Sequence, residues 1–274
     1  MTLVLLVRHG LTAGTGSVLT GRMPGIELDD RGRDQATAVG ARLADVPLDA
    51  IISSPLQRCR ETAAAIAAAR NGSQMAVTED DRFAEVAYGD WTGKPIKRLA
   101  KEPLWRVVQA HPSAVRFPGP DGESLPGVQQ RAVAAIRDWN ERLGPKAVYL
   151  VCSHGDVIKS IIADSLGLHL DMFQRIQVDP CSVSLIRYTP LRPFVLRMND
   201  TGAGLGGVAG SRSAERGVAG SRSAERGVAG SRSAERGLAE AEPTAGAPGQ
   251  PGAAAAGRSG LGEGDAVIGG GAGG

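Results

Sequence analysis

The chain has 274 residues, a formal net charge of +2 and 22% charged residues. So small a net charge does not indicate a nucleic-acid or membrane-surface partner, which usually shows as clustered basic patches and a high domain pI, and we expect neither. No apolar stretch approaches the roughly 18 residues of a membrane span, and the short apolar N-terminal run lacks the basic flank of a signal peptide. Cys59, Cys152 and Cys181 are odd in number and lack CxxC spacing, so they indicate reduced thiols in a cytoplasmic protein.

The composition of the chain changes near residue 200. From Thr201 onward there is no aromatic residue, and more than half of the 38 glycines lie there. Residues 1–200 are therefore predicted to form the globular domain. Residues 201–274 include three tandem copies of GVAGSRSAER, a unit too short and too poor in apolar residues to build a repeat core. We expect this tail to be disordered.

The first elements follow the order strand, loop, helix, strand, helix. Thr2 to Val7 is apolar without alternation, which predicts a strand covered on both faces. After a glycine-rich loop, Asp29 or Asp30 is expected to cap a helix. A short strand is expected at Ala50 to Ser53. This order favours a parallel α/β sheet.

An alanine-rich helix is expected next, with Ser54 as its N-cap and Pro55 as its first residue. Residues Thr78 to Pro120 mix short helical pieces with Gly and Pro, which indicates an excursion over the top of the sheet. The stretch SLPGVQQRAVAAIRDWNERL predicts an amphipathic helix, and KAVYLVCSHGDVIKSIIADSLG predicts a buried strand that leads into another helix. CSVSLIRY and PFVLRMND alternate and are expected to form a closing strand pair.

Polar side chains follow three of the expected strands at their carboxyl ends. Arg8 and His9 end the first strand, Arg58 follows the second by about one helical turn, and His154 follows the buried strand YLVCS. Ligands of open parallel sheets bind outside this edge. We therefore expect two arginines and two histidines to meet there.

Such a cluster is suited to a phosphate ester. Arginine binds phosphate oxygens bidentately and stays charged, and a helix N-terminus beside Arg58 favours an anion. A neutral imidazole can attack phosphorus while the guanidinium groups neutralise the developing charge. The remaining requirement is a proton donor for the leaving group, and Glu85, in the loop FAEVAYGDWTG, is the candidate.

Five motifs in order, RHGLT, SSPLQRCRETA, FAEVAYGDWTG, PDGES and SHGDVI, resemble those of the histidine phosphatase superfamily, the phosphoglycerate mutase-like proteins, over about residues 2–188. The resemblance implies a three-layer α/β/α sandwich with one antiparallel strand in a mostly parallel sheet. It implies that His9 is the phosphohistidine nucleophile and Glu85 the general acid. It implies neither a metal nor a nucleotide or other cofactor.

The resemblance also implies the residues that bind substrate. Arg8, Arg58 and His154 are expected to clamp the phosphate. The full set of expected substrate-binding residues is Arg8, Gly10, Thr12, Thr20, Gly21, Arg58, Tyr88 and His154. The family usually has an asparagine shortly after the first motif. This chain has Gly14, Thr15 and Gly16 there, so Thr12 or Thr15 is expected to supply that hydrogen-bond donor.

Three functions remain open from the sequence. The preferred one is hydrolysis of a small phosphomonoester metabolite. The chain has GDVIK where the mutases have GNSLR, and it has the single Arg106 where the mutases carry adjacent arginines after the acid. Its excursion over the sheet is also short for a mutase lid. The second is a phosphomutase, which uses the same residues. The third is a non-catalytic phospho-ligand binder or scaffold. The expected partner is a small phosphorylated substrate, with a homodimer left open as the oligomeric state. A metal site is disfavoured because no HxH or HxxxH spacing occurs.

Overall fold

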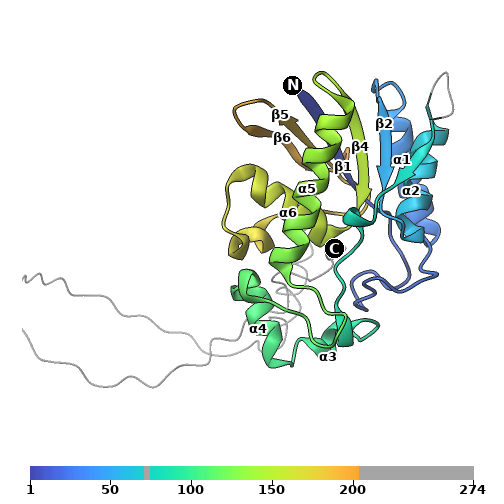
Figure 1. Ribbon diagram of the computed structural model, residues 1–274. Helices are drawn as coiled ribbons and strands as arrows, with labels where there is room; N and C mark the ends of the chain where they lie inside the picture. Colours follow the sequence, from blue (N-terminus) through green and yellow to red (C-terminus); the bar gives the residue numbers. More distant parts are fainter. Residues whose placement is uncertain (71–74, 204–274) are drawn as a thin grey trace, which may run out of the picture. The chain divides into compact units, whose positions relative to one another are not determined.

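The computed structural model describes residues 1–70 and 75–203, and the expected disordered tail with its repeats lies outside the described residues. A six-stranded sheet in the order β3-β2-β4-β1-β5-β6 is the central layer (Figure 1). The strands are β1 (Thr2–Arg8), β2 (Ala50–Ser53), β3 (Val77–Glu79), β4 (Val148–Ser153), β5 (Val183–Tyr188) and β6 (Pro193–Asp200).

The sheet is mostly parallel, as expected. β1 pairs with β4, β4 with β2, and β2 with β3, all in parallel. β5 runs antiparallel to both of its neighbours, β1 and β6. β5 is therefore the one antiparallel strand, and the expected closing strand pair, β5 and β6, is confirmed.

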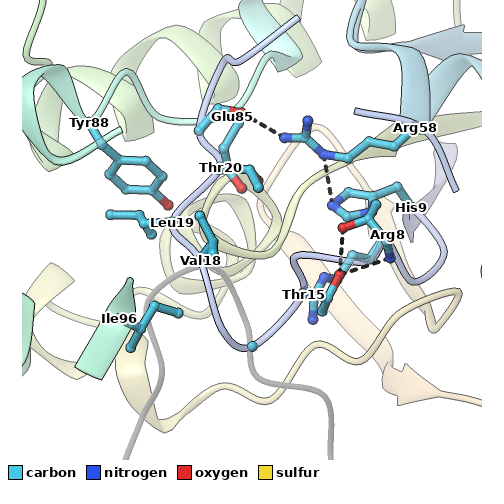
Figure 2. A pocket seen from close by; sticks show the side chains of 13 residues that line it. Arg8, His9, Thr15, Val18, Leu19, Thr20, Arg58, Glu85, Tyr88 and Ile96 are labelled. Atoms are coloured by element: carbon cyan, nitrogen blue, oxygen red, sulfur yellow. Dashed lines mark hydrogen bonds between the residues drawn. The ribbon is translucent and has the colours of Figure 1, made fainter. Parts of the chain in front are cut away.

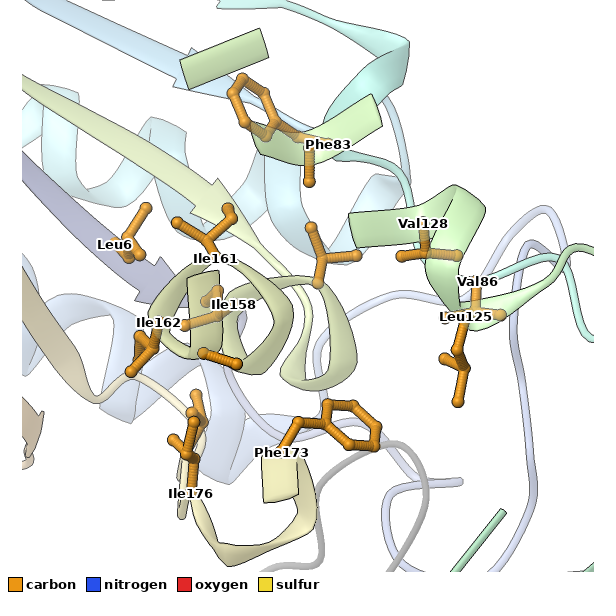
Figure 3. Packing of buried hydrophobic residues seen from close by; sticks show 14 of the residues in the cluster. Leu6, Phe83, Val86, Leu125, Val128, Ile158, Ile161, Ile162, Phe173 and Ile176 are labelled. Carbon is orange, nitrogen blue, oxygen red and sulfur yellow. The ribbon is translucent and has the colours of Figure 1, made fainter. Parts of the chain in front are cut away.

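Helices cover both faces of the sheet, which confirms the three-layer sandwich (Figure 1). α1 (Asp30–Leu43) and α2 (Gln57–Ala68) pack on one face, and α5 (Leu125–Leu143) and α6 (Gly155–Leu166) pack on the other. In β1, Val4 and Leu6 enter the α5/α6 core while Leu5 and Val7 enter the α1/α2 core. Figure 3 shows the α6 side of this packing, where Leu6 lies near isoleucines of α6. Burial on both faces explains why the strand has no polar alternation.

The excursion between β3 and α5 holds only short helices. Its α-helices are α3 (Ile96–Leu99) and α4 (Pro103–Ala110). The 3₁₀ turns of the described chain are Asp81–Phe83, Gly89–Trp91, Pro112–Ala114 and Leu170–Arg175. The prediction that the excursion starts at Thr78 is wrong, because Val77–Glu79 is strand β3 at the sheet edge. Three residues are too few for a periodic pattern to stand out in the sequence.

The predicted start of α2 is also wrong. The helix begins at Gln57, its N-cap is Leu56, and no side chain caps it. Ser54 lies before the helix, where its hydroxyl accepts a hydrogen bond from the backbone N–H of Leu56 at 3.3 Å and is hydrogen-bonded to the ring of His154 at 2.8 Å. The hydroxyl therefore has a distant tertiary partner in addition to a local one.

The N-terminus of α1 lies against the loop that follows β1. Asp29 caps the helix, as one of the two expected candidates, by accepting a hydrogen bond from the backbone N–H of Gly32 at 2.7 Å. A Cβ at Gly32 would collide with the backbone of Leu11, and one at Gly10 would collide with the carbonyl of Gly32. Glycine at both positions thus lets two backbones approach directly beside His9.

No helix among the described residues is long and apolar enough to cross a membrane. Cys59, Cys152 and Cys181 are buried and free, in agreement with the expectation of reduced thiols.

Replacing Gly32 with alanine tests the close backbone contact. The added methyl group must displace the Leu11 backbone, so the G32A variant should lose about 2–3 kcal/mol of unfolding free energy in chemical denaturation, as overpacked sites do. The matched control is Asp34→Ala, on an exposed position of the same helix, which should change stability by no more than about 0.5 kcal/mol. Equal stabilities of the two variants would contradict the contact.

Candidate active site

The predicted polar residues meet at the carboxyl edge of the parallel strands. Arg8 is the last residue of β1, and the backbone N–H of His9 donates to the carbonyl of Ser153 at the end of β4 at 3.0 Å. His154 follows β4 as the N-cap of α6, and Arg58 is the second residue of α2. The ordinary geometry of a parallel sheet therefore assembles the cluster.

His9 is held in one tautomer. Its Nδ1 lies 2.7 Å from the carbonyl oxygen of Gly10, which can only accept, so Nδ1 carries the proton. The lone pair is then on Nε2, which accepts a hydrogen bond from Nε of Arg58 at 3.2 Å. Burial, followed by the charges of Arg58 and Arg8, holds the pKa of His9 well below 6.5. The ring is a neutral imidazole with its nucleophilic nitrogen facing a guanidinium group (Figure 2).

Two buried guanidinium groups supply positive charge at the site. Arg58 donates from Nη2 to the carbonyl of Gly21 at 2.8 Å and to Nδ1 of His154 at 3.1 Å. Its Nη1 is buried and has no hydrogen-bond partner within the described chain. Arg8 is held by the carbonyl of Val178 at 2.7 Å, and burial lowers its pKa from 12.5. The unsatisfied N–H group of Arg58 is the donor that an oxyanion would satisfy.

His154 is also neutral, with the opposite tautomer. Its Nδ1 accepts from Arg58, so the proton is on Nε2, which donates to the hydroxyl of Ser54 at 2.8 Å. The Sγ of Cys59 lies 3.4 Å from the same nitrogen. Burial and the charge of Arg58 keep the pKa of His154 well below 6.5. Sequence reasoning found His154 but missed Ser54 as its partner.

Glu85 lies beside the histidines and is only 4% exposed, with its Oε2 3.9 Å from Nδ1 of His154. Burial, and next the charge of Asp156, raise its pKa to about 7, against the opposing charge of Arg58. Arg22 and Arg131 hold its backbone carbonyl at 2.7 and 3.2 Å. A carboxyl group in this environment is protonated in part near neutral pH, as a general acid requires.

Asp156 is a residue that the sequence reasoning missed. It lies in the first turn of α6, is 1% exposed, and accepts a hydrogen bond from the hydroxyl of Tyr88 at 2.8 Å. Lys159 lies 4.0 Å from its other oxygen. One sequence feature could have identified it. Asp156 is the acidic residue of SHGDVIK, two positions after His154, and the N-terminus of a buried helix favours a carboxylate there.

A pocket opens onto these groups (Figure 2). Of the expected residues, those that line it are Arg8, His9, Thr12, Thr20, Gly21, Arg58, Glu85 and Tyr88. Gly10 and His154 lie behind the lining, where Gly10 orients His9 and His154 contacts Arg58. The lining residues outside the expected binding set are Thr15, Gly16, Val18, Leu19 and Ile96.

Thr12 and Thr15, the two candidates for the donor that replaces the family's asparagine, both line the pocket. Their hydroxyl groups are 2.9 Å apart, and the backbone N–H of Thr12 donates to the hydroxyl of Thr15 at 3.0 Å. The pair shares one hydrogen-bonded turn, so both remain candidates. Over residues 1–70 and 75–203, no group of three or more His, Cys, Asp or Glu residues could hold a metal ion.

The three-layer sandwich, with arginines, histidines and a glutamate gathered at the carboxyl ends of its parallel strands, is that of an α/β enzyme that acts on phosphomonoesters. The model of the histidine phosphatase superfamily (branch 1) matches residues 4–201, and the chain belongs to this family.

Individual relatives include both phosphatases and mutases. Phosphoserine phosphatase 1 of Hydrogenobacter thermophilus is 31% identical over 207 residues, which cover 73% of this chain and 93% of that protein. A probable phosphoglycerate mutase of Erwinia tasmaniensis is 30% identical over 187 residues, which cover 68% and 85%. The crystal structure of an Entamoeba histolytica phosphoserine phosphatase with 3-phosphoglyceric acid has a TM-score of 0.65 at 25% identity and covers 73% of this chain and 98% of that one.

Removing the charge of Asp156 tests its effect on Glu85. Because this charge is a leading cause of the raised pKa, Asp156→Asn should lower the pKa of the Glu85 carboxyl from about 7, as followed by NMR titration of labelled glutamate. Asp164→Asn changes the same charge at an exposed position of α6 and should leave the titration unchanged. An unchanged pKa in D156N would show that burial alone sets it.

Proposed function

We propose that this protein hydrolyses small phosphomonoesters through a phosphohistidine intermediate on His9. The observation that carries the proposal is the neutral imidazole of His9, whose lone pair on Nε2 faces the buried guanidinium group of Arg58, in a pocket that Arg8 and Glu85 also line. A nucleophile, a phosphate clamp and a proton donor are thus present together.

In the first step, Nε2 of His9 forms a bond to phosphorus and the ester P–O bond breaks. Glu85 gives its proton to the departing oxygen, so the product leaves as a neutral alcohol. Arg8 and Arg58 neutralise charge on the phosphoryl oxygens, and the buried Nη1 of Arg58 gains a partner. The Gly10 carbonyl stabilises the positive charge that develops on the ring during attack, through its bond to Nδ1–H.

In the second step, water attacks the phosphohistidine. Glu85, now a carboxylate, accepts a proton from this water as its oxygen bonds to phosphorus. The P–N bond breaks, inorganic phosphate leaves, and the lone pair returns to Nε2 of His9. Glu85 ends the cycle protonated, so the step is balanced without any further reactant.

Hydrolysis is preferred to mutase activity for this chain. The relatives include proteins of both names. The excursion over the site, with only the short helices α3 and α4, is small for a lid that must exclude water from a phosphohistidine. The presence of Arg8, His9, Arg58, Glu85 and His154 argues against a silent binding protein. We further propose a cytoplasmic location, which the free cysteines support.

The nucleophile is tested by replacing His9. The wild-type protein should release phosphate from phenyl phosphate without added metal and give an acid-labile phosphoenzyme in rapid-quench labelling. His9→Ala should reduce both below detection, because Nε2 of His9 supplies the attacking lone pair. His111→Ala, at an exposed histidine that does not line the pocket, should retain both. Turnover that survives H9A, or that requires a divalent cation, would refute the mechanism. Primer-dependent isomerisation of phosphoglycerate without phosphate release would instead favour the mutase.

The proton donor is tested by the pH dependence of kcat/KM. The first step needs Glu85 protonated, so kcat/KM should fall as pH rises through about 7, while its decline in acid should lie well below pH 6.5, where His9 becomes protonated. Glu85→Gln should remove the alkaline decline and cost about 10²–10⁴-fold with poor leaving groups. A kcat/KM that rises through pH 7 would exclude Glu85 as the acid.

A further inference from the structure

The pocket has two chemically different sides (Figure 2). One side is polar, and Figure 2 shows Arg8, His9, Arg58 and Thr15 there. The opposite side, which we call the apolar wall, is formed by Val18, Leu19, Tyr88 and Ile96. A phosphoryl group on Nε2 of His9 would occupy the polar side, so the rest of the ester faces the apolar wall.

The apolar wall is fixed by backbone hydrogen bonds. Residues 17–19 lie along residues 93–96 and form an isolated antiparallel bridge between Val18 and Pro95. Leu19 N–H donates to the carbonyl of Lys94 at 3.0 Å, and its own carbonyl accepts from Gly93 at 2.8 Å. Ile96 N–H donates to the carbonyl of Ser17 at 2.9 Å. Backbone hydrogen bonds therefore fix the positions of Val18, Leu19 and Ile96 in the wall.

The wall offers no positive charge to a ligand. Among the residues that line the pocket, the cationic ones are Arg8 and Arg58, and both lie on the polar side. Lys94, Lys97 and Arg98 surround Ile96 in the sequence but do not line the pocket, and the last two are exposed. Arg22 is committed to the carbonyl of Glu85 and to the carboxylate of Glu123.

Hydrogen-bond donors on the wall are also committed. The N–H groups of Val18, Leu19 and Ile96 all donate to backbone carbonyls, and the Tyr88 hydroxyl donates to Asp156. The side chain of Thr20 lies between the two sides in Figure 2 and also lines the pocket. A carboxylate held against the wall would lose its hydration without gaining a partner.

We infer that the preferred substrates are phosphomonoesters whose leaving group is uncharged and largely apolar, such as aryl or branched alkyl esters, and that esters with a carboxylate on the leaving group are disfavoured. This inference rests on the proposed function, and it names the substrate class of the same site. Val18, Leu19 and Ile96 are the specificity-determining residues.

A matched pair of esters tests the inference. Phenyl phosphate and 4-carboxyphenyl phosphate differ by one carboxylate, and the carboxylate-bearing phenol is the slightly better leaving group. The wild-type kcat/KM should be at least about tenfold higher for phenyl phosphate, because a carboxylate without a partner is costly at an apolar surface. The dissociation constants of both esters for the His9→Ala protein should differ in the same direction. Equal or reversed preference would overturn the inference while leaving the phosphatase proposal intact. Absence of turnover with tighter binding of phenyl phosphate would overturn the proposed function alone.

A charge placed on the wall provides the complementary test. Ile96→Lys should raise kcat/KM for 4-carboxyphenyl phosphate relative to phenyl phosphate by about tenfold, the range of a charge-assisted hydrogen bond. Ala100→Lys adds the same charge at the exposed C-cap of α3 and should leave the ratio unchanged. The same change of ratio in both variants would show that long-range charge, and not the wall, sets the preference.

Discussion

The site depends on the hydrogen bond from Nδ1 of His9 to the carbonyl of Gly10. At 2.7 Å this bond fixes the proton on Nδ1, and it therefore leaves the lone pair on Nε2, where it faces Arg58. Gly10 can hold this position because it has no Cβ, which would collide with the carbonyl of Gly32, and because its N–H donates to Thr62 at 3.1 Å. Contacts from the end of β1, the start of α1 and the second turn of α2 thus together orient the imidazole ring of His9.

The charges around this ring follow from the same burial. Two guanidinium groups cannot easily share a buried edge with charged imidazoles, and burial together with Arg58 lowers the pKa of both His9 and His154. The positive charge then belongs to Arg8 and Arg58, which line the pocket where an anion would bind. Burial acts on Glu85 in the opposite direction and raises its pKa to about 7. One physical cause, the loss of water, therefore produces a neutral nucleophile and a partly protonated acid in the same pocket.

The sequence predicted the parts of the site that depend on strand ends. Arg8, His9 and His154 each follow a buried apolar run, and parallel strands bring such ends to one edge, so the sequence pattern alone indicates that they meet. The order of the layers and the single antiparallel strand came from the family resemblance. Strand β3 was missed because three residues carry too weak a pattern.

The parts that the sequence did not predict depend on contacts between distant segments. Ser54 has the chemistry of a helix cap, but the structure also brings His154 within 2.8 Å of its hydroxyl. Asp156 affects Glu85 only because α6 packs beside the loop that carries Glu85 and Tyr88. The apolar wall exists because residues 17–19 pair with residues 93–96, and neither segment has a pattern that indicates the other. Specificity in this fold thus depends on loop pairing, whereas the reactive groups depend on the strands.

The central claim is that the phosphoryl group is carried on Nε2 of His9. The most direct measurement is ¹H–¹⁵N NMR of the protein phosphorylated with phosphoramidate, because the ring nitrogens of a phosphohistidine have distinct shifts and couplings. The result expected is phosphorylation of His9 at Nε2, with Nδ1 still protonated and bonded to Gly10. Phosphorylation at Nδ1 of His9, or on His154, would contradict the claim.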